Sequence, residues 1–227
     1  GNDETRSNYG GLVANGGIQY RAKLGKAYFL RLGAYGNLKH TFNGTRDVVV
    51  ETFQYNNSSG APLSIDSVYH EKGIKGDVVY PASYGAGIIL EKDLKWLIGV
   101  DYSATQWDDY RFFGEQEPVR NSWAMHVGAQ LFPSGLNSYW RRVFYRAGFS
   151  LGTDYISIEK DLPKWSASVG LGLPMRPPNY SNQFSVINLS LEFGRRGNKE
   201  NLIRENFFRI GVGLSLTDIW FLKRKFD

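Results

Sequence analysis

Apolar residues alternate with small or polar residues over long stretches of this chain, and this period of two restricts its fold more than any other feature. Near the C-terminus, Ile210, Val212, Leu214 and Leu216 alternate with Arg209, Gly211, Gly213 and Ser215. The pattern also covers residues 18–22, 28–38, 96–104, 123–131, 143–151, 165–173 and 187–194. Successive side chains of a β-strand point to opposite faces, so the pattern predicts strands. We find no convincing helical period and predict an all-β fold.

Two all-β architectures fit such strands: a soluble sandwich and a transmembrane antiparallel β-barrel. Many runs last about ten residues, the length of a tilted strand that crosses a bilayer, whereas strands of soluble proteins have about 5–6. The polar half of each run is mainly Gly, Ser and Asn, which suits an enclosed lumen better than open water. Aromatic residues gather near the ends of the runs, as in interfacial girdles, among them Tyr28, Trp96, Trp107, Trp123, Trp140 and Trp220. We predict the barrel.

Composition removes several other classes of protein. The 227 residues include no cysteine, which excludes a disulfide scaffold, a Cys-ligated metal and a thiol nucleophile. The three histidines, His40, His70 and His126, are too far apart in sequence for a local metal pair, so we expect no metal and no cofactor. No apolar run approaches the roughly 18 residues of a membrane-spanning helix. The basic residues behind the net charge of +5 do not cluster, which argues against nucleic-acid binding.

Turn signals divide the chain into about nine strands, which we expect to form a single barrel domain over residues 1–227. The predicted spans are 10–22, 27–55, 64–91, 95–112, 120–133, 139–152, 164–174, 184–195 and 205–217. Short and long connections alternate, as between the periplasmic turns and external loops of outer-membrane barrels. The second and third spans exceed one crossing, so we expect a tall external hairpin with its tip at residues 56–60. Pro81 predicts a local irregularity in the wall.

This topology places the C-terminus in the periplasm and the first residue outside. Residues 1–4 have no basic or apolar leader features, so either a signal peptide has been removed or the chain begins partway through a longer protein. Single-chain barrels usually have an even number of strands and both ends in the periplasm. We therefore expect either an odd number of missing preceding strands, with an open edge at residues 10–22, or one strand that the turn signals do not reveal.

Three neighbouring segments carry a family resemblance. They read YPASYGAG at residues 80–87, WLIGVDYS at 96–103 and QWDDY at 106–110. They resemble the outer-membrane long-chain fatty-acid transporter (FadL-type) family, in which a Leu-Pro strand with glycine precedes a strand with aromatic, Gly, Asp-Tyr and Trp positions. Tyr80 stands where that family more often has Leu. Later segments at 145–149, 170–174, 188–197 and 205–215 are similar to its C-terminal strands, so the resemblance covers about residues 75–221.

The resemblance implies the C-terminal portion of a fourteen-stranded barrel with an N-terminal hatch and a lateral opening in its wall. Nine strands and five more would give that number. It also implies the outer membrane of a Gram-negative bacterium and transport of hydrophobic small molecules such as long-chain fatty acids. Since the hatch and most of the pocket would lie outside this chain, no substrate-contacting residue is carried over.

Charged and polar residues with lumen parity are the candidate ligand-binding residues: Arg21, Arg31, Asp101, His126, Arg146, Glu192 and Arg209. Arginine binds carboxylates through two parallel hydrogen bonds, so they suit an anchor for a carboxylate headgroup. Pairing among the charges themselves, which satisfies ionised groups in a confined interior, is the alternative that we favour. A lipolytic Ser/His/Asn site around His126 is a further alternative, but a lone histidine in a polar wall more often only forms hydrogen bonds. We expect no enzyme.

Transport of a hydrophobic ligand is thus the first functional hypothesis. The alternative is a non-transporting outer-membrane barrel that acts as a structural partner in a secretion or barrel-assembly complex, because one fold hosts many functions. Expected partners are outer-membrane lipids and lipopolysaccharide, a hydrophobic ligand and, in the alternative, a protein. The external charges Arg195, Arg196 and Lys199 would suit lipopolysaccharide phosphates, but solvated loop charge is the explanation that we favour.

Overall fold

The computed structural model describes residues 2–56, 60, 62–93, 95–133, 138–156, 160–175 and 185–216. These residues form two antiparallel sheets of nine and four strands, with two short 3-10 helices, η1 (Trp107–Asp109) and η2 (Tyr139–Arg142). The predicted all-β antiparallel fold is confirmed. Residues 57–59 of the predicted hairpin tip, and Trp220, lie outside the described residues.

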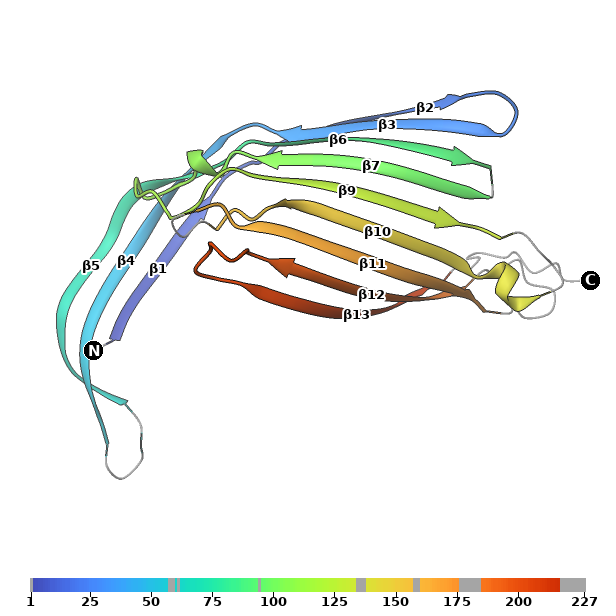
Figure 1. Cartoon of the computed structure of the whole chain (residues 1–227). Coiled ribbons are helices and arrows are strands. Elements are labelled where there is room, and N and C mark those ends of the chain that lie inside the picture. The colour runs from blue at the N-terminus through green and yellow to red at the C-terminus, as the bar shows by residue number, and fades with distance from the viewer. Residues whose placement is uncertain are drawn as a thin grey trace, which may run out of the picture.

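The larger sheet is a half-barrel that we call the wall (Figure 1), with strand order β13-β12-β11-β10-β9-β7-β6-β3-β2. Its strands are β2 (Asn15–Lys23), β3 (Tyr28–Asn37), β6 (Ser83–Lys92), β7 (Trp96–Thr105), β9 (Ser122–Leu131), β10 (Phe144–Thr153), β11 (Pro163–Pro174), β12 (Val186–Arg196) and β13 (Glu205–Ser215). The wall has nine strands, the predicted number of crossings, but the predicted spans 27–55 and 64–91 contribute only β3 and β6 to it, and the described residues contain four further strands outside the wall. However, β2 and β13 do not pair with each other, so a closed barrel is not formed by the described residues.

The register of the wall aligns residues of like polarity across most of its nine strands, with Phe207 on β13 as an exception. One aligned row consists of Tyr20, Leu32, Ile88, Val100, Val127, Phe149, Ala167, Phe193 and Phe208. The adjacent row, on the opposite face, consists of Gln19, Gly33, Gly87, Asp101, His126, Ser150, Ser166, Gly194 and Phe207. We call these two sides the apolar face and the polar face.

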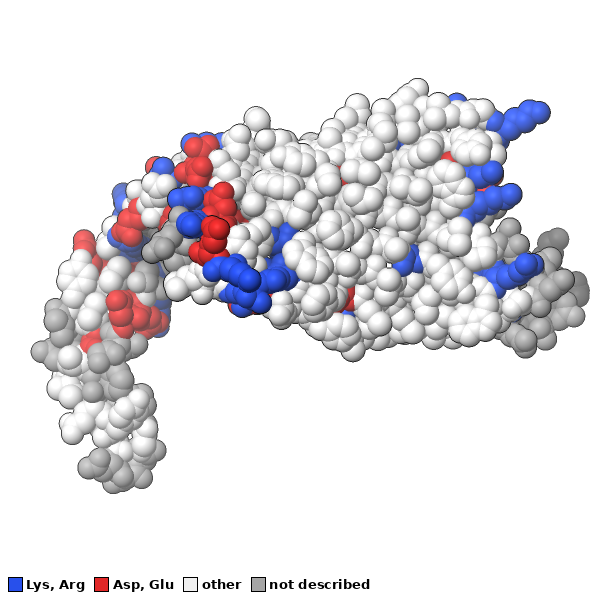
Figure 2. Space-filling model, viewed as in Figure 1, with Lys and Arg blue, Asp and Glu red and all other residues white. Residues whose placement is uncertain are grey.

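The apolar face is exposed, since Ile210 and Val212 have relative exposures of 66% and 72%. The division of residues 209–216 between two faces is as predicted, and no second sheet packs on the apolar set within the described residues. In Figure 2 the visible side of the wall is almost free of charge, and Lys, Arg, Asp and Glu lie near its two ends.

The smaller sheet, with order β1-β4-β5-β8, projects from one end of the wall and bends away from it (Figure 1). It consists of β1 (Asn2–Gly10), β4 (His40–Tyr55), β5 (Pro62–Tyr80) and β8 (Arg111–Phe112). We call it the outer sheet. The projection agrees with the predicted tall hairpin, but the two long strands predicted there are each divided. Their interruptions lie at residues 38–39 and 81–82.

Pro81 explains one interruption, because proline has no N–H to donate to the ladder. Its carbonyl leaves the ladder too and accepts a hydrogen bond of 3.0 Å from the Asn37 amide. Strand β1 was not predicted. Its sequence NDETRSNYG has no apolar alternation, because it lies at the edge of the outer sheet with largely exposed side chains. The hairpin therefore belongs to a separate four-stranded sheet, in which β4 and β5 extend beyond β1 at the far end, and it is not a continuation of the wall.

Candidate functional site

Among the described residues, the wall has two edge strands without an outer partner, β2 and β13, and neither contains the β-bulge or proline that often blocks an edge strand of a soluble protein. Both β2 and β13 pair with their inner neighbours without a register shift. Neither contains a proline, and β13 is an unbroken run of 11 residues, ENFFRIGVGLS. Exposed edges of soluble sheets are usually shortened, bulged or interrupted by proline to prevent pairing with another chain. These two edges are therefore competent to accept further strands.

The two edges also run in the same direction. Each of the eight neighbouring pairs of the nine-stranded wall is antiparallel. With an odd number of alternating strands, β2 and β13 must point the same way. An antiparallel completion of this sheet consequently requires an odd number of added strands.

On the polar face, Arg21 and Arg31 converge on a single carboxylate. The guanidinium groups of both residues donate hydrogen bonds of 2.7 Å to Glu91, one to each oxygen. The Glu91 side chain is 13% exposed, while those of Arg21 and Arg31 are 51% and 38% exposed. Sequence reasoning selected both arginines but missed Glu91, which shares their parity at the end of β6. The two arginines therefore pair with a carboxylate of the protein itself, which is the alternative that we favoured over an anchor for a ligand's carboxylate headgroup.

Arg146 and Arg209 also have partners within the wall. Arg146 donates to Gln130 at 2.5 Å and to Asn188 at 2.6 Å, and the Asn188 amide donates to the Ser215 hydroxyl at 3.0 Å. Arg209 donates to Glu192 at 2.8 Å, directly across the β12–β13 ladder. Neutral amides were not among the candidates, although Gln130 and Asn188 have the same parity as Arg146. Arg146, Glu192 and Arg209 thus have partners on neighbouring strands.

Asp101 and His126 face each other in the β7–β9 register, and Ser150 follows on β10. This row has the residue types of a serine hydrolase. Within the described part of the chain, no hydrogen bond nevertheless joins any two of these three side chains. The Asp101 carboxylate instead leans over Gly87, where it occupies the place of a β-carbon. The arrangement therefore lacks the linked nucleophile, base and orienting acid that such chemistry needs.

The connector between β7 and β9 closes the base of the outer sheet. The Phe113 ring packs over Gly76 and Gly44, which are paired in the β4–β5 register. Phe113 has a φ of 51°, rare for a residue with a side chain. Arg46 covers the same ring at 5.2 Å from its centroid. In the same connector, Trp107 stacks on Tyr155 with centroids 4.9 Å apart, and burial raises the pKa of the Tyr110 phenol.

Aromatic side chains mark both ends of the apolar face. At the end with the short turns, Tyr28 and Trp96 contact each other edge to face and Tyr145 lies in the same aligned row. At the other end, Tyr102 stacks on Trp123. Along β7, the rows of Trp96 and of Trp123 are eight residues apart, about 26 Å at 3.3 Å per residue. That span is close to the ~25 Å apolar band of membrane barrels, and the predicted girdles are present at these positions.

No cluster of three or more metal-ligating side chains occurs among the described residues. Within the same residues, no helix is long and apolar enough to span a membrane. The external arginine Arg196 is not free for lipopolysaccharide, since it forms ion pairs with Asp154 at 3.0 Å and Glu205 at 3.7 Å.

An antiparallel wall with one apolar face between aromatic girdles and one polar face of small residues is the architecture of outer-membrane β-barrel proteins. A family model described as BamG matches the whole chain, residues 1–227. The chain belongs to the BamG family. No curated protein and no solved structure matches it.

The family assignment corrects the predicted one. Membership of the FadL-type family is wrong, and so is its consequence, transport of fatty acids through a hatch and a lateral exit. The segments YPASYGAG and WLIGVDYS combine alternation, glycine and interfacial aromatics, which the architecture requires of any membrane-barrel strand. They identify the class of protein and not that family. The BamG match favours the alternative hypothesis, a protein related to barrel assembly.

Proposed function

We propose that this chain is a structural, non-transporting component of a barrel-assembly complex in the outer membrane of Gram-negative bacteria. Its partner would be another protein of that complex rather than a transported molecule. The observation that carries the proposal is the BamG family match over residues 1–227. The unblocked edges and exposed apolar face of the wall support a role in an assembly within the membrane.

We further propose that the wall is part of one closed barrel domain, completed by an odd number of additional antiparallel strands. Five would give fourteen strands, the number that the FadL-type resemblance implied. The physical support is the cost of free edges in lipid, where each unpaired backbone group costs several kcal/mol. The apolar face would contact acyl chains, and the outer sheet would project outside the membrane.

The polar face requires no chemistry under this proposal. Five of its seven candidate residues form hydrogen bonds within the wall, namely Arg21, Arg31, Arg146, Glu192 and Arg209, and Asp101 lies opposite His126 in the β7–β9 register. We propose that these residues stabilise the wall and that neither catalysis nor a cofactor is involved. A ligand in the lumen would have to compete with these internal bonds.

The proposal is tested by affinity purification from native membranes in mild detergent. We expect the tagged full-length protein to co-purify with the core insertase of barrel assembly at a fixed ratio. Depletion should lower the levels of several unrelated outer-membrane barrels together. Normal levels of those barrels, combined with a specific defect in uptake of one hydrophobic compound, would contradict the proposal and favour transport.

A further inference from the structure

The apolar face contains a groove of about 510 Å³ near the short-turn end of β10 to β13. Its apolar lining side chains are Tyr145, Val169, Leu171, Leu189, Leu191 and Ile210. The remaining lining residues, Arg146, Gly170, Ser190 and Gly211, align in one row of the polar face, and three of them have small side chains or none. The groove is therefore bounded by apolar side chains.

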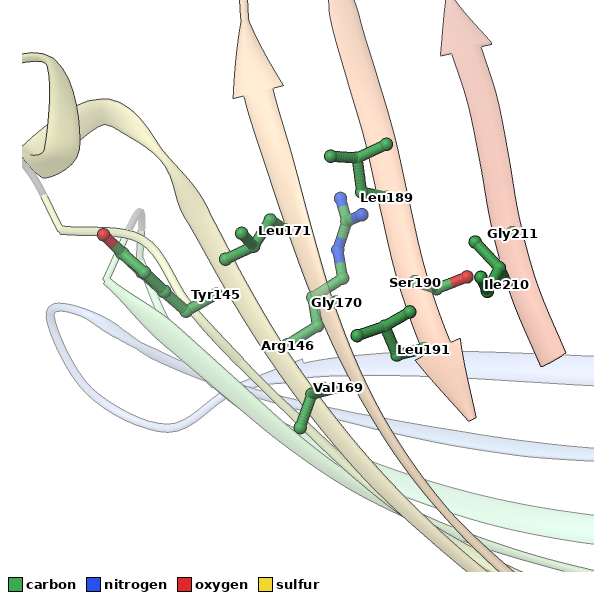
Figure 3. A pocket seen from close by; sticks show the side chains of 10 residues that line it. All are labelled: Tyr145, Arg146, Val169, Gly170, Leu171, Leu189, Ser190, Leu191, Ile210 and Gly211. Atoms are coloured by element: carbon green, nitrogen blue, oxygen red, sulfur yellow. The ribbon is translucent and has the colours of Figure 1, made fainter. Parts of the chain in front are cut away.

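Figure 3 shows how alternation builds this groove. The side chains of Leu189 and Leu191 extend to one side of β12, and that of Ser190 between them extends to the other. Val169 and Ile210 are 59% and 66% exposed, so the groove is open along the apolar face. A flexible hydrocarbon chain can enter it without displacing any described part of the protein.

The groove ends beside a basic and aromatic segment. The Tyr145 side chain points toward η2, and its hydroxyl donates a hydrogen bond of 3.1 Å to the Trp140 carbonyl (Figure 3). Helix η2 also carries Arg141 and Arg142, both exposed, and the Arg142 guanidinium lies 5.7 Å from the centre of the Tyr139 ring. Trp140 is 62% exposed. Aromatic and cationic side chains at this position are typical of the headgroup level of a membrane.

The positive charge continues along this end of the wall. The short turns and adjoining strand ends carry Lys23, Lys26, Lys92 and Lys95, and the Lys92 ammonium lies 5.1 Å from the centre of the Tyr28 ring. Asp93 is the acidic residue of the β6–β7 turn. Figure 2 shows blue side chains and almost no red at this end, whereas the opposite end mixes both signs. An anionic partner fits this end of the molecule and not the other.

We propose that the groove binds one acyl chain of an anionic phospholipid and that Arg141 and Arg142 hold its phosphate. Three features that follow one another along the molecule identify the ligand. An open groove lined by apolar side chains suits an acyl chain, aromatic side chains lie beside it, and two guanidinium groups beyond them suit a phosphate. A neutral apolar ligand would leave the arginines unused. This site does not depend on the assembly role, because it requires only that the apolar face lies in a membrane.

The test measures lipid retention by the purified full-length protein in detergent, using native mass spectrometry. The two probes are dioleoyl-phosphatidylglycerol and dioleoyl-phosphatidylcholine, which have the same acyl chains and differ in headgroup charge. We expect preferential retention of phosphatidylglycerol. The double variant Arg141→Gln/Arg142→Gln should reduce that retention about 25-fold, since each of the two charges near an anionic surface contributes about fivefold. Phosphatidylcholine retention should change little.

Matched variants separate this site from general effects. Lys72→Gln/Lys75→Gln removes the same charge from the outer sheet and should leave lipid retention unchanged. Val169→Trp fills the groove and should reduce retention of both lipids, whereas Val212→Trp on the same face, outside the groove, should not. Val169→Phe replaces Val169→Trp if the larger side chain prevents folding.

Three outcomes would overturn the proposal. The first is equal retention of both lipids by the unmodified protein. The second is an equal change in lipid retention within either matched pair. The pairs are the arginine and lysine double variants, and Val169→Trp with Val212→Trp. The third is unchanged lipid retention in Arg141→Gln/Arg142→Gln together with loss of a protein subunit from the complex, which would assign the basic end to protein binding. A failed co-purification with normal lipid retention would instead contradict only the assembly role.

Discussion

The ring of Phe113 lies against Gly76, in the space that a β-carbon at residue 76 would fill. The contact joins the β7–β9 connector to the outer sheet. A β-carbon added at Gly44, on the neighbouring strand, would lie 3.4 Å from Cζ of the same ring. Glycine is required at residue 76 for close approach and not for an unusual backbone angle. The Phe113 ring is thus one of the contacts that join the connector to the base of the outer sheet, together with the pairing of β8 with β5.

The substitution Gly76→Ala should therefore loosen the base of the outer sheet. Forcing a methyl group against a packed ring typically costs about 1–3 kcal/mol. Limited proteolysis of the purified protein should show faster cleavage in β4 and β5, while the wall remains resistant. Gly10→Ala is the matched control, because a β-carbon there meets nothing within 4 Å. Equal cleavage of the two variants would show that the contact has no structural role.

Loss of the Glu91 carboxylate should weaken the wall near β2 and β3. Glu91→Gln leaves two guanidinium groups sharing a neutral acceptor, and we expect a loss of about 1–2 kcal/mol, discounted for the exposure of both arginines. Arg209→Gln breaks a pair in which the arginine is 70% exposed and should cost less than about 1 kcal/mol. The temperature at which the folded band disappears on semi-native gels ranks the two variants. A larger loss of stability in Arg209→Gln than in Glu91→Gln would contradict the expectation that the more buried pair contributes more.

Adjacent positions on β9 should respond oppositely to a charge if the apolar face lies in lipid. Val127 is in the middle row of that face, and Gly128 points to the polar face with nothing within 4 Å of an added β-carbon. Val127→Arg should cost about 2–4 kcal/mol near the bilayer midplane, and Gly128→Arg much less. Unfolding titrations in lipid vesicles measure both. Similar costs would indicate that neither face contacts hydrocarbon.

Replacement of His126 by alanine should leave function intact if the polar face is structural. The same result is expected for Ser150→Ala, because no hydrogen bond within the described part of the chain joins the His126 and Ser150 side chains. Levels of outer-membrane barrels in cells provide the first measurement, and release of fatty acid from phospholipid by the purified protein provides the second. Ester hydrolysis that both substitutions abolish would establish the lipolytic alternative instead.

Much of the wall could be predicted from sequence, because a membrane strand must alternate in polarity and this alternation is directly visible in the order of the residues. Residues 209–216 show this directly. The division of the long strands at residues 38–39 was missed, since the flanking segments both favour strand and only tertiary bending separates them. Strand β1 was missed because an edge strand with solvent around it needs no apolar period.

The polar face was predictable in part. Parity selected Arg21, Arg31 and Arg209 correctly as residues of one face, and the partner of Arg146 could have been found by extending parity to amides such as Gln130. The position of Phe113 over Gly76 could not have been predicted from the sequence, because the path of a connector depends on the three-dimensional arrangement of both sheets. The family was misassigned for a related reason: physical constraints on membrane strands make unrelated barrels alike in sequence.

The interruptions at residues 38–39 and 81–82 have a mechanical consequence. A continuous ladder would transmit any load on the outer sheet directly into the hydrogen bonds of the wall. Among the described residues, the two sheets are joined through the chain crossings at residues 11–14, 38–39 and 81–82 and through the connector that carries Phe113. A load on the outer sheet would therefore reach the wall through these segments and not along a shared ladder.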